Sequence, residues 1–197
     1  MGPDLDGAIG ILGGQIAGAR EYGDKEGIVR LSATRAFLIM YHNTDETENL
    51  LASAAFEALK AYPIFDEDHL VDARIALLGL PHRASEIRAR LLVGLGLPER
   101  ASAEFITTVN LAALLAGNTT DLLPTPGRRT DVAAAILSRN TNALRRLMNV
   151  DVTTVERYGF RLYRDPTQWY PIFSALIVAA AAKQGLALTL RLPKLPS

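Results

Sequence analysis

Residues 78–102 read LGLPHRASEIRARLLVGLGLPERAS, and the octet at 78–85 returns almost unchanged at 95–102. In each copy a glycine is followed by leucine and proline. A glycine at the end of one helix and a proline at the start of the next are typical of helix termini. The segment therefore predicts two similar corners joined by a short helix, and it favours an all-α fold. Two copies are too few to indicate a solenoid, which needs about three or more repeating units.

Helical periodicity continues on both sides of these corners. Val29, Ala33 and Phe37 recur at helical spacing, and turn residues arrive at helix-length intervals. We predict an all-α, multi-helix bundle of about eight or nine helices with an extended C-terminal arm. The predicted helices cover residues 5–20, 25–41, 44–63, 66–79, the segment between the corners, the segment from the second corner to 117, and residues 131–149, 152–158 and 167–184.

The formal net charge is zero, but acidic and basic residues are separated along the chain. Residues 1–75 carry 6 basic and 13 acidic side chains, whereas residues 76–197 carry 15 basic and 8 acidic ones. Such asymmetry indicates a nucleic-acid surface or electrostatically matched partners. The predicted segments are an acidic N-terminal helical bundle at 1–117, a loop at 118–130, a basic helical segment at 131–185 and the arm at 186–197.

The composition excludes several classes of protein. The chain has no cysteine, so disulfides, thiolate zinc sites and thiol nucleophiles are excluded. The first ten residues lack the basic segment of a secretory signal. The longest apolar run, residues 172–182, is too short to span a bilayer. We therefore expect a soluble protein that no signal peptide directs to secretion.

No local motif predicts an enzyme, a metal site or a cofactor. The glycine-rich start lacks the phosphate-loop patterns, and there is no zinc-protease or calcium-loop motif. In the acidic segment DEDHLVD only Asp68 and Asp72 share a helix face, and a helix dipole stabilises such acids without a ligand. His42, His69 and His82 are widely spaced and no nucleophile motif accompanies them, although folding can assemble a catalytic site. We expect no enzymatic activity, no metal and no cofactor.

Arginines are concentrated in the C-terminal half. Guanidinium groups make planar, multidentate contacts with phosphate, and rings such as Tyr158 and Tyr163 can stack on bases. Arg139 and Arg146, seven residues apart, are expected to lie along one border of the apolar face of the helix at 131–149. The predicted nucleic-acid-binding residues are Arg128, Arg129, Arg139, Arg145, Arg146, Arg157, Arg161 and Arg164.

Two other interpretations of these arginines remain open. They could pair with the acidic half of the same chain or of a neighbour, or they could form a solvated face. The pattern does not match the signatures of RRM, KH, homeodomain or zinc-finger proteins.

Two further segments predict contacts between copies of the chain. Small residues recur every four positions near the start, which would let another backbone approach closely. In the arm, leucines alternate with other residues at the period of an extended strand, and they need a surface, either the chain's own body or another copy. The predicted subunit-contact residues are Gly10, Gly14, Gly18, Leu186, Leu188, Leu190 and Leu192.

These features lead to one working hypothesis and one alternative. Opposite charges at the two ends of a protomer suit head-to-tail contacts, which propagate as open helical arrays unless a ring closes. An arginine surface neutralises phosphates without reading sequence. The hypothesis is a self-assembling coat or nucleocapsid protein of a helical, filamentous virus, found in the virion and the host-cell cytoplasm, whose partners are its own copies and a nucleic-acid backbone. The alternative is a cellular all-α interaction or scaffold module that binds an acidic protein partner.

Overall fold

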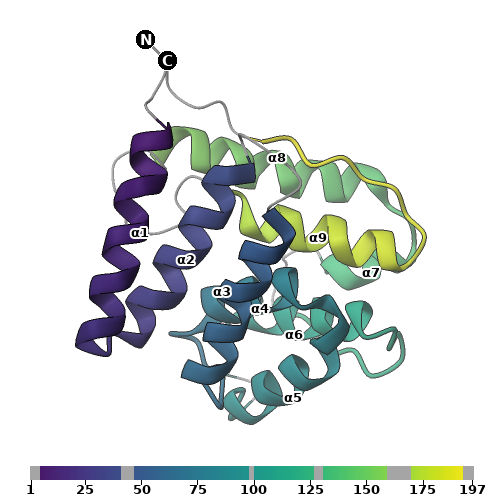
Figure 1. The fold of residues 1–197 in the computed structure, drawn as a ribbon. Coiled ribbons are helices and arrows are strands. Elements are labelled where there is room, and N and C mark those ends of the chain that lie inside the picture. Colours follow the sequence, from purple (N-terminus) through teal and green to yellow (C-terminus); the bar gives the residue numbers. More distant parts are fainter. Residues whose placement is uncertain (1–4, 41–46, 98–99, 127–130, 159–169, 193–197) are drawn as a thin grey trace.

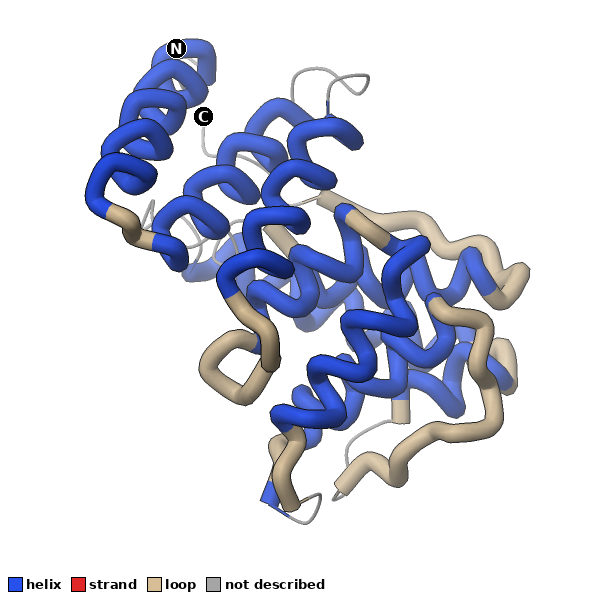
Figure 2. The backbone as a smooth tube through the Cα atoms, turned by 60° about the horizontal axis from the view of Figure 1, so that its bottom comes forward, coloured by secondary structure: helices blue, strands red, loops and turns tan. Residues whose placement is uncertain are grey.

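The computed structural model describes residues 5–40, 47–97, 100–126, 131–158 and 170–192, with only the backbone at 5–6, 40, 47–48 and 155–158. The described residues form nine α-helices and one short 3-10 helix, without any strand (Figures 1 and 2). The predicted all-α fold is confirmed. The helices are α1 (Leu5–Tyr22), α2 (Lys25–Met40), α3 (Thr47–Ala61), α4 (Leu70–Gly79), η1 (Pro81–Arg83), α5 (Ala84–Gly94), α6 (Ala103–Leu115), α7 (Val132–Leu137), α8 (Thr141–Tyr158) and α9 (Ile172–Lys183).

The helices pack around α4, α6 and α9, which lie at the centre of the molecule. Helices α1 to α3 pack on one another in chain order, α4 packs on α3, and α5 packs on α6. Helix α8 crosses the top of the view in Figure 1, from the side of α7 to the side of α1. Residues 105–115 of α6 are all buried, and α9 is also apolar on nearly every side, as expected of a helix surrounded by others. Helix α9 contacts α4, α6 and α8. One hydrophobic core therefore extends from Val29 to Leu186 and includes both predicted helical segments, whose boundaries remain a prediction.

The two predicted corners are both present, but their glycines have different roles. Gly79 ends α4, and a β-carbon at this position would clash with the carbonyl oxygen of Leu51 in α3. Gly96 follows α5 with a φ of +58°, a left-handed conformation that favours glycine. In the second corner Ser102 caps α6, because its hydroxyl oxygen accepts a hydrogen bond from the Phe105 N–H at 3.0 Å. The glycine thus allows two helices to pack closely in the first corner, whereas in the second it allows a left-handed turn of the backbone.

An ion-pair network joins the first corner to the end of α3. Glu86 accepts hydrogen bonds from Arg83 at 2.7 Å and from Arg90 at 2.8 Å. Arg90 also donates to the carbonyl oxygens of Leu59 at 2.6 Å and Tyr62 at 2.8 Å. The last carbonyl groups of a helix have no partner within the helix. Arg90 therefore satisfies two of them and connects α5 to α3.

Replacing Glu86 with glutamine is expected to lower stability at pH 7 and to lower it less at pH 3. Burial opposes ionisation, but the hydrogen bonds and charges of Arg83 and Arg90 outweigh it and lower the pKa of Glu86. Its stabilisation is therefore present above the unfolded pKa of about 4.3 and is lost as the pH falls through the folded pKa. Because the pairs are partly exposed, we expect a loss of about 1 kcal/mol at pH 7, measurable by urea unfolding. An equal loss at both pH values would show that the charge of Glu86 is not its source.

Residues 131–149 do not form the single helix that was predicted. Helix α7 ends in a Schellman motif, in which Arg139 has a φ of +56° and the Asn140 N–H donates to the Ala135 carbonyl at 2.8 Å. The side chain of Asn140 then caps α8 by accepting a hydrogen bond from the Ala143 N–H at 3.1 Å. The helix break therefore lies at Arg139. Helix α8 then continues without interruption through residues 149–152, where one helix was predicted to end and another to begin.

Two more predicted features are changed by the structure. Arg139 and Arg146 do not lie along one helix, because Arg139 occupies the corner between α7 and α8. Helix α9 begins at Ile172 and not at residue 167, and the described residues Tyr170 and Pro171 before it are not helical. A proline has no N–H to donate and therefore belongs at the beginning of a helix or before it.

The described part of the C-terminal arm lies against its own chain. Residues 186–192 have no regular secondary structure and turn back after α9 (Figure 1). Leu186 is buried, and Leu188, Leu190 and Leu192 pack against the core. This contact supplies the surface that the alternating leucines need. Residues 193–197 lie outside the described residues.

None of the helices in the described part of the chain combines the length and the apolar character needed to cross a membrane.

Candidate nucleic-acid interface

Three of the eight predicted arginines have described side chains, and all three are exposed. They are Arg139 at the corner between α7 and α8, and Arg145 and Arg146 in the first half of α8. Arg157 lies near the end of α8, where only the backbone is described. The predicted residues outside the described part of the chain are Arg128, Arg129, Arg161 and Arg164.

The buried face of α8 directs two of these arginines to solvent. Leu144, Met148 and Val152 recur every four residues and are all buried. Residues at this spacing lie on one side of a helix, so this side faces the core. Arg145 and Arg146 immediately follow Leu144 around the helix and are exposed. The packing of α8 therefore determines where the arginines point.

The carboxylates of the same region are engaged inside the fold. Asp131 caps α7 by accepting a hydrogen bond from the Ala134 N–H at 3.0 Å. Asp151 accepts two hydrogen bonds from Ser174 in α9, from its N–H at 3.0 Å and from its hydroxyl at 2.5 Å. These are the two acidic residues of 131–154. The positive side chains of this region therefore face solvent, and its negative ones are held by the fold.

No described residue forms an ion pair or hydrogen bond with the side chains of Arg139, Arg145 or Arg146. The interpretation that the arginines pair with acids of the same chain therefore does not apply to these three within the described structure. The exposed, unpaired state is the one that a polyanion can engage without first breaking internal contacts.

Two arginines elsewhere in the chain, Arg74 and Arg88, form contacts inside the fold. Arg74 is buried in α4, where its Nε donates to the Thr108 hydroxyl at 3.1 Å and its guanidinium lies 5.0 Å from the centre of the Phe173 ring. Burial lowers the pKa of Arg74, and the nearby charge of Glu104 opposes that change. Arg88 donates to the carbonyl oxygen of Asp121 at 2.6 Å. These side chains stabilise the fold and are not available to a ligand.

Arg139 occupies a position that usually contains glycine. A left-handed conformation costs a residue with a β-carbon about 1–2 kcal/mol, whereas a cation near a helix C-terminus gains only about 0.3–1 kcal/mol. The structure therefore holds a charged side chain where an uncharged glycine would be more stable. Strained backbone of this kind is concentrated at functional positions.

Lys183 is a further basic residue that sequence reasoning missed. The hydrogen bonds between Asp151 and Ser174 join α8 and α9, which run in opposite directions (Figure 1). The exposed last residue of α9, Lys183, is thereby placed at the same end of the helix pair as the start of α8. We call Arg139, Arg145, Arg146 and Lys183 the basic end. No local signal in the sequence predicts this neighbourhood, because it depends on the pairing of α8 with α9.

The structure holds one copy of the chain, so it shows where the predicted subunit-contact residues lie and does not test whether they contact another copy. A β-carbon added at Gly10, Gly14 or Gly18 would meet no atom within 4 Å, so this face of α1 is open and close approach by another copy remains a prediction. The four leucines of the arm lie on the core of their own chain, as described above.

Two of the three histidines lie among the described residues, His69 directly before α4 and His82 in η1. His69 bonds to Asp66, with 2.6 Å between its Nδ1 and the carboxylate oxygen, and its ring lies 4.2 Å from that of Tyr62. His82 is exposed in η1, and His42 lies outside the described residues. The described part of the chain contains no group of three or more potential metal ligands.

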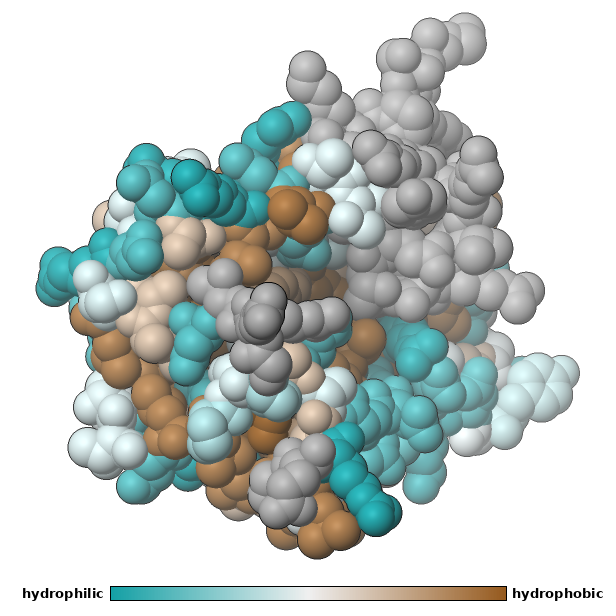
Figure 3. Space-filling model, turned by 180° about the vertical axis from the view of Figure 1, so that it is seen from behind, coloured by the Kyte–Doolittle hydropathy of each residue, from teal (hydrophilic) through white to brown (hydrophobic). Residues whose placement is uncertain are grey.

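Hydropathy does not by itself locate a binding surface. In the view from behind, hydrophilic side chains are spread over several parts of the molecule and alternate with hydrophobic ones (Figure 3). The basic end is distinguished by its charge, and the side chains of its three arginines have no ion-pair or hydrogen-bond partner among the described residues. Comparison with models of protein families, with curated proteins and with solved structures finds no match to this chain, and the candidate interface therefore stands on its own residues.

Proposed function

We propose that this chain is a structural, self-assembling protein that packages nucleic acid, as the coat or nucleocapsid subunit of a helical virus. The observation that carries the proposal is the basic end, in which three arginines are exposed and have no partner among the described residues, while Asp131 and Asp151 beside them are bound within the fold. The strained position of Arg139 adds to it, because stability alone would favour glycine there.

The proposed mechanism is stoichiometric charge neutralisation. Each guanidinium can donate two parallel hydrogen bonds to the oxygens of one backbone phosphate. Arg145 and Arg146 are neighbours in α8 and point about 100° apart around the helix, so they would engage different phosphates. Contacts of this kind fix the position of the backbone and carry no information about base sequence.

Assembly in this proposal depends on α1 rather than on the leucine arm. The outer face of α1 carries Ile11 and Tyr22, whose exposed fractions are 65% and 86%, beside the open glycine positions. Exposed apolar side chains that gather on one face are typical of protein contacts. The described leucines of the arm are already in contact with their own core and are not needed for this interface.

Salt titration of binding to random-sequence DNA and RNA tests the packaging proposal. If each subunit makes three or four phosphate contacts, log K should fall against log salt with a slope of about −2 to −4. Different random sequences should give the same affinity, because no base is read. A flat salt response would contradict the proposal.

The alternative, an interaction module that binds an acidic protein, is favoured by one observation. The arm packs on its own chain and one core joins both halves, so the fold does not need a second copy for completion. Size-exclusion chromatography with light scattering separates the two functions. Polymers or co-purifying nucleic acid support the coat protein, and a discrete monomer or dimer free of nucleic acid supports the module.

A further inference from the structure

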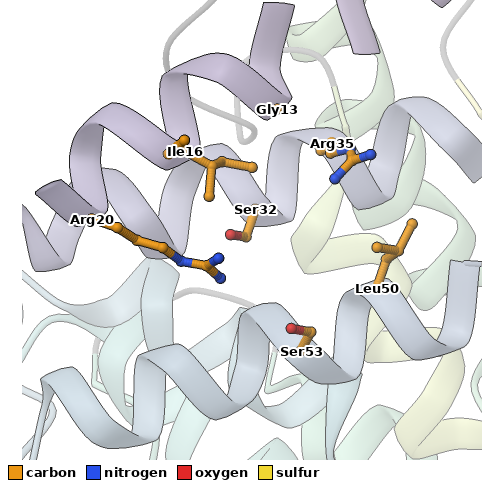
Figure 4. A pocket seen from close by; sticks show the side chains of 8 residues that line it. Gly13, Ile16, Arg20, Ser32, Arg35, Leu50 and Ser53 are labelled. Carbon is orange, nitrogen blue, oxygen red and sulfur yellow. The ribbon is translucent and has the colours of Figure 1, made fainter. Parts of the chain in front are cut away.

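We propose that a pocket between α1, α2 and α3 binds a phosphate group. The pocket has a volume of about 160 Å³ and is lined by two arginines, two serines, two small residues of α1 and the apolar side chains of Ile16 and Leu50. Figure 4 shows the guanidinium of Arg20 extending from α1 toward the space between Ser32 of α2 and Ser53 of α3, with Arg35 on the far side. The site lies on different helices from the basic end and does not depend on the function proposed for that end.

Both arginines of the pocket lack a partner within the described structure. Neither Arg20 nor Arg35 forms an ion pair or hydrogen bond through its side chain with another described residue. The Nε of Arg35 is also buried away from solvent without an acceptor. A buried donor that remains unpaired costs about 1–3 kcal/mol. An oxyanion in the pocket would remove that cost.

The ion pair of a neighbouring arginine shows that arginines of this region pair with a carboxylate where one lies within reach. Arg30, on the same helix as Arg35, forms an ion pair with Glu26 at 2.8 Å. None of the residues that line the pocket is acidic. The pocket is therefore a positive site within the half of the chain that carries the excess of negative charge.

The chemistry of the lining favours a tetrahedral oxyanion over other ligands. Two guanidinium groups supply charge and paired N–H donors, and two serine hydroxyls supply further donors. An apolar ligand would leave these donors unpaired, and a cation would be repelled. At roughly 10–15 Å³ for each water position, the pocket has room for several waters and therefore for a partly hydrated phosphate.

A glycine keeps one wall of the pocket open. Gly13 of α1 lines the pocket, and a β-carbon added there would meet no atom within 4 Å. The β-carbon of a larger side chain at this position therefore fits without a clash, and the rest of that side chain would occupy space beside the pocket. The change Gly13→Leu offers a way to fill the pocket while leaving its charge unchanged.

Isothermal titration calorimetry with inorganic phosphate, against sodium chloride of equal ionic strength, tests the site. We expect phosphate to bind and Arg20→Gln to weaken binding about tenfold, the effect of losing one charged hydrogen bond. Arg20 is exposed, so this variant is expected to fold. Gly13→Leu should abolish binding, and Arg100→Gln, at an exposed position outside both the pocket and the basic end, should leave it unchanged.

A second titration identifies the source of the phosphate. If a short oligothymidylate without a terminal phosphate competes with inorganic phosphate in the wild-type chain and not in Arg20→Gln, the pocket accepts a nucleic-acid backbone. If it does not compete, the pocket accepts free phosphate or a phosphomonoester. Absence of phosphate binding to the wild-type chain, or equal binding to wild-type and Arg20→Gln, would overturn the proposal whatever the basic end does.

Discussion

A chain with Arg139→Gly, Arg145→Ala and Arg146→Ala is expected to bind nucleic acid on the order of 1,000-fold more weakly at low salt, about tenfold for each lost contact. Each lost phosphate contact should also reduce the slope of log K against log salt by about 0.9 for duplex DNA, so the three changes together should reduce it by about 2.7. The measurement is fluorescence anisotropy with a labelled random-sequence duplex over a range of salt concentrations. An unchanged slope would exclude these side chains from the interface.

Glycine at residue 139 ensures that a loss of binding in this variant cannot be attributed to a loss of stability. Glycine suits the left-handed conformation of this residue, so its introduction should add about 1 kcal/mol of stability. Alanine at the exposed positions 145 and 146 is a good helix former. The variant should therefore unfold at the same temperature as the wild-type chain or above it.

A charge-matched control completes the experiment. Changing Lys25, Lys60 and Arg100 to alanine removes the same three charges from exposed positions on other parts of the molecule. This control should keep most of the affinity and the salt slope, because its residues lie on helices away from the basic end. Equal losses in both variants would show that only the net charge of the chain matters.

Replacing Phe37 with alanine is expected to lower the free energy of unfolding by about 3–5 kcal/mol. Phe37 is completely buried in α2, and its ring stacks on that of Tyr170 with 4.1 Å between the centroids and 10° between the planes. The substitution removes the buried ring, its stacking partner and the volume that both fill. Urea unfolding followed by circular dichroism measures the loss. A loss below about 1 kcal/mol would contradict the stacked arrangement.

Phe37→Leu is the matched control. Leucine retains much of the buried apolar volume and loses the stacking, so a clearly smaller loss of stability is expected. Tyr170 ends the segment at 156–170, in which three arginines alternate with five aromatic residues. Its side chain is 2% exposed and stacks on Phe37 of α2. At least this ring of the segment therefore belongs to the core and is not available to stack on a base.

Local sequence signals predicted the parts of the fold that depend on local chemistry. The corners at Gly79 and Gly96 were predicted because helix ends favour glycine and proline. The buried side of α2 was predicted from the spacing of Val29, Ala33 and Phe37, all of which are fully buried. Even so, the sequence did not distinguish the close contact at Gly79 from the left-handed turn at Gly96, because the first depends on where α3 lies.

The remaining features depend on unusual conformations or on tertiary contacts. Asn140 can lie in a helix or cap one, and the left-handed Arg139 has no signature in the sequence, so the break between α7 and α8 was missed. Lys183 joins the basic end only through the pairing of α8 with α9. The leucines of the arm predicted a docked segment, but which surface they contact is a property of the folded chain.

The central place of α9 has a consequence for biosynthesis. A ribosome makes this helix after every other described helix, yet α4, α6 and α8 each need it to cover an apolar side. Until residue 183 has left the exit tunnel, the emerging polypeptide lacks the helix that fills its centre, and the apolar sides of α4, α6 and α8 are exposed to solvent. Chaperones that shield nascent chains would therefore act on a nearly complete chain, before α9 packs into the core in a late, long-range step.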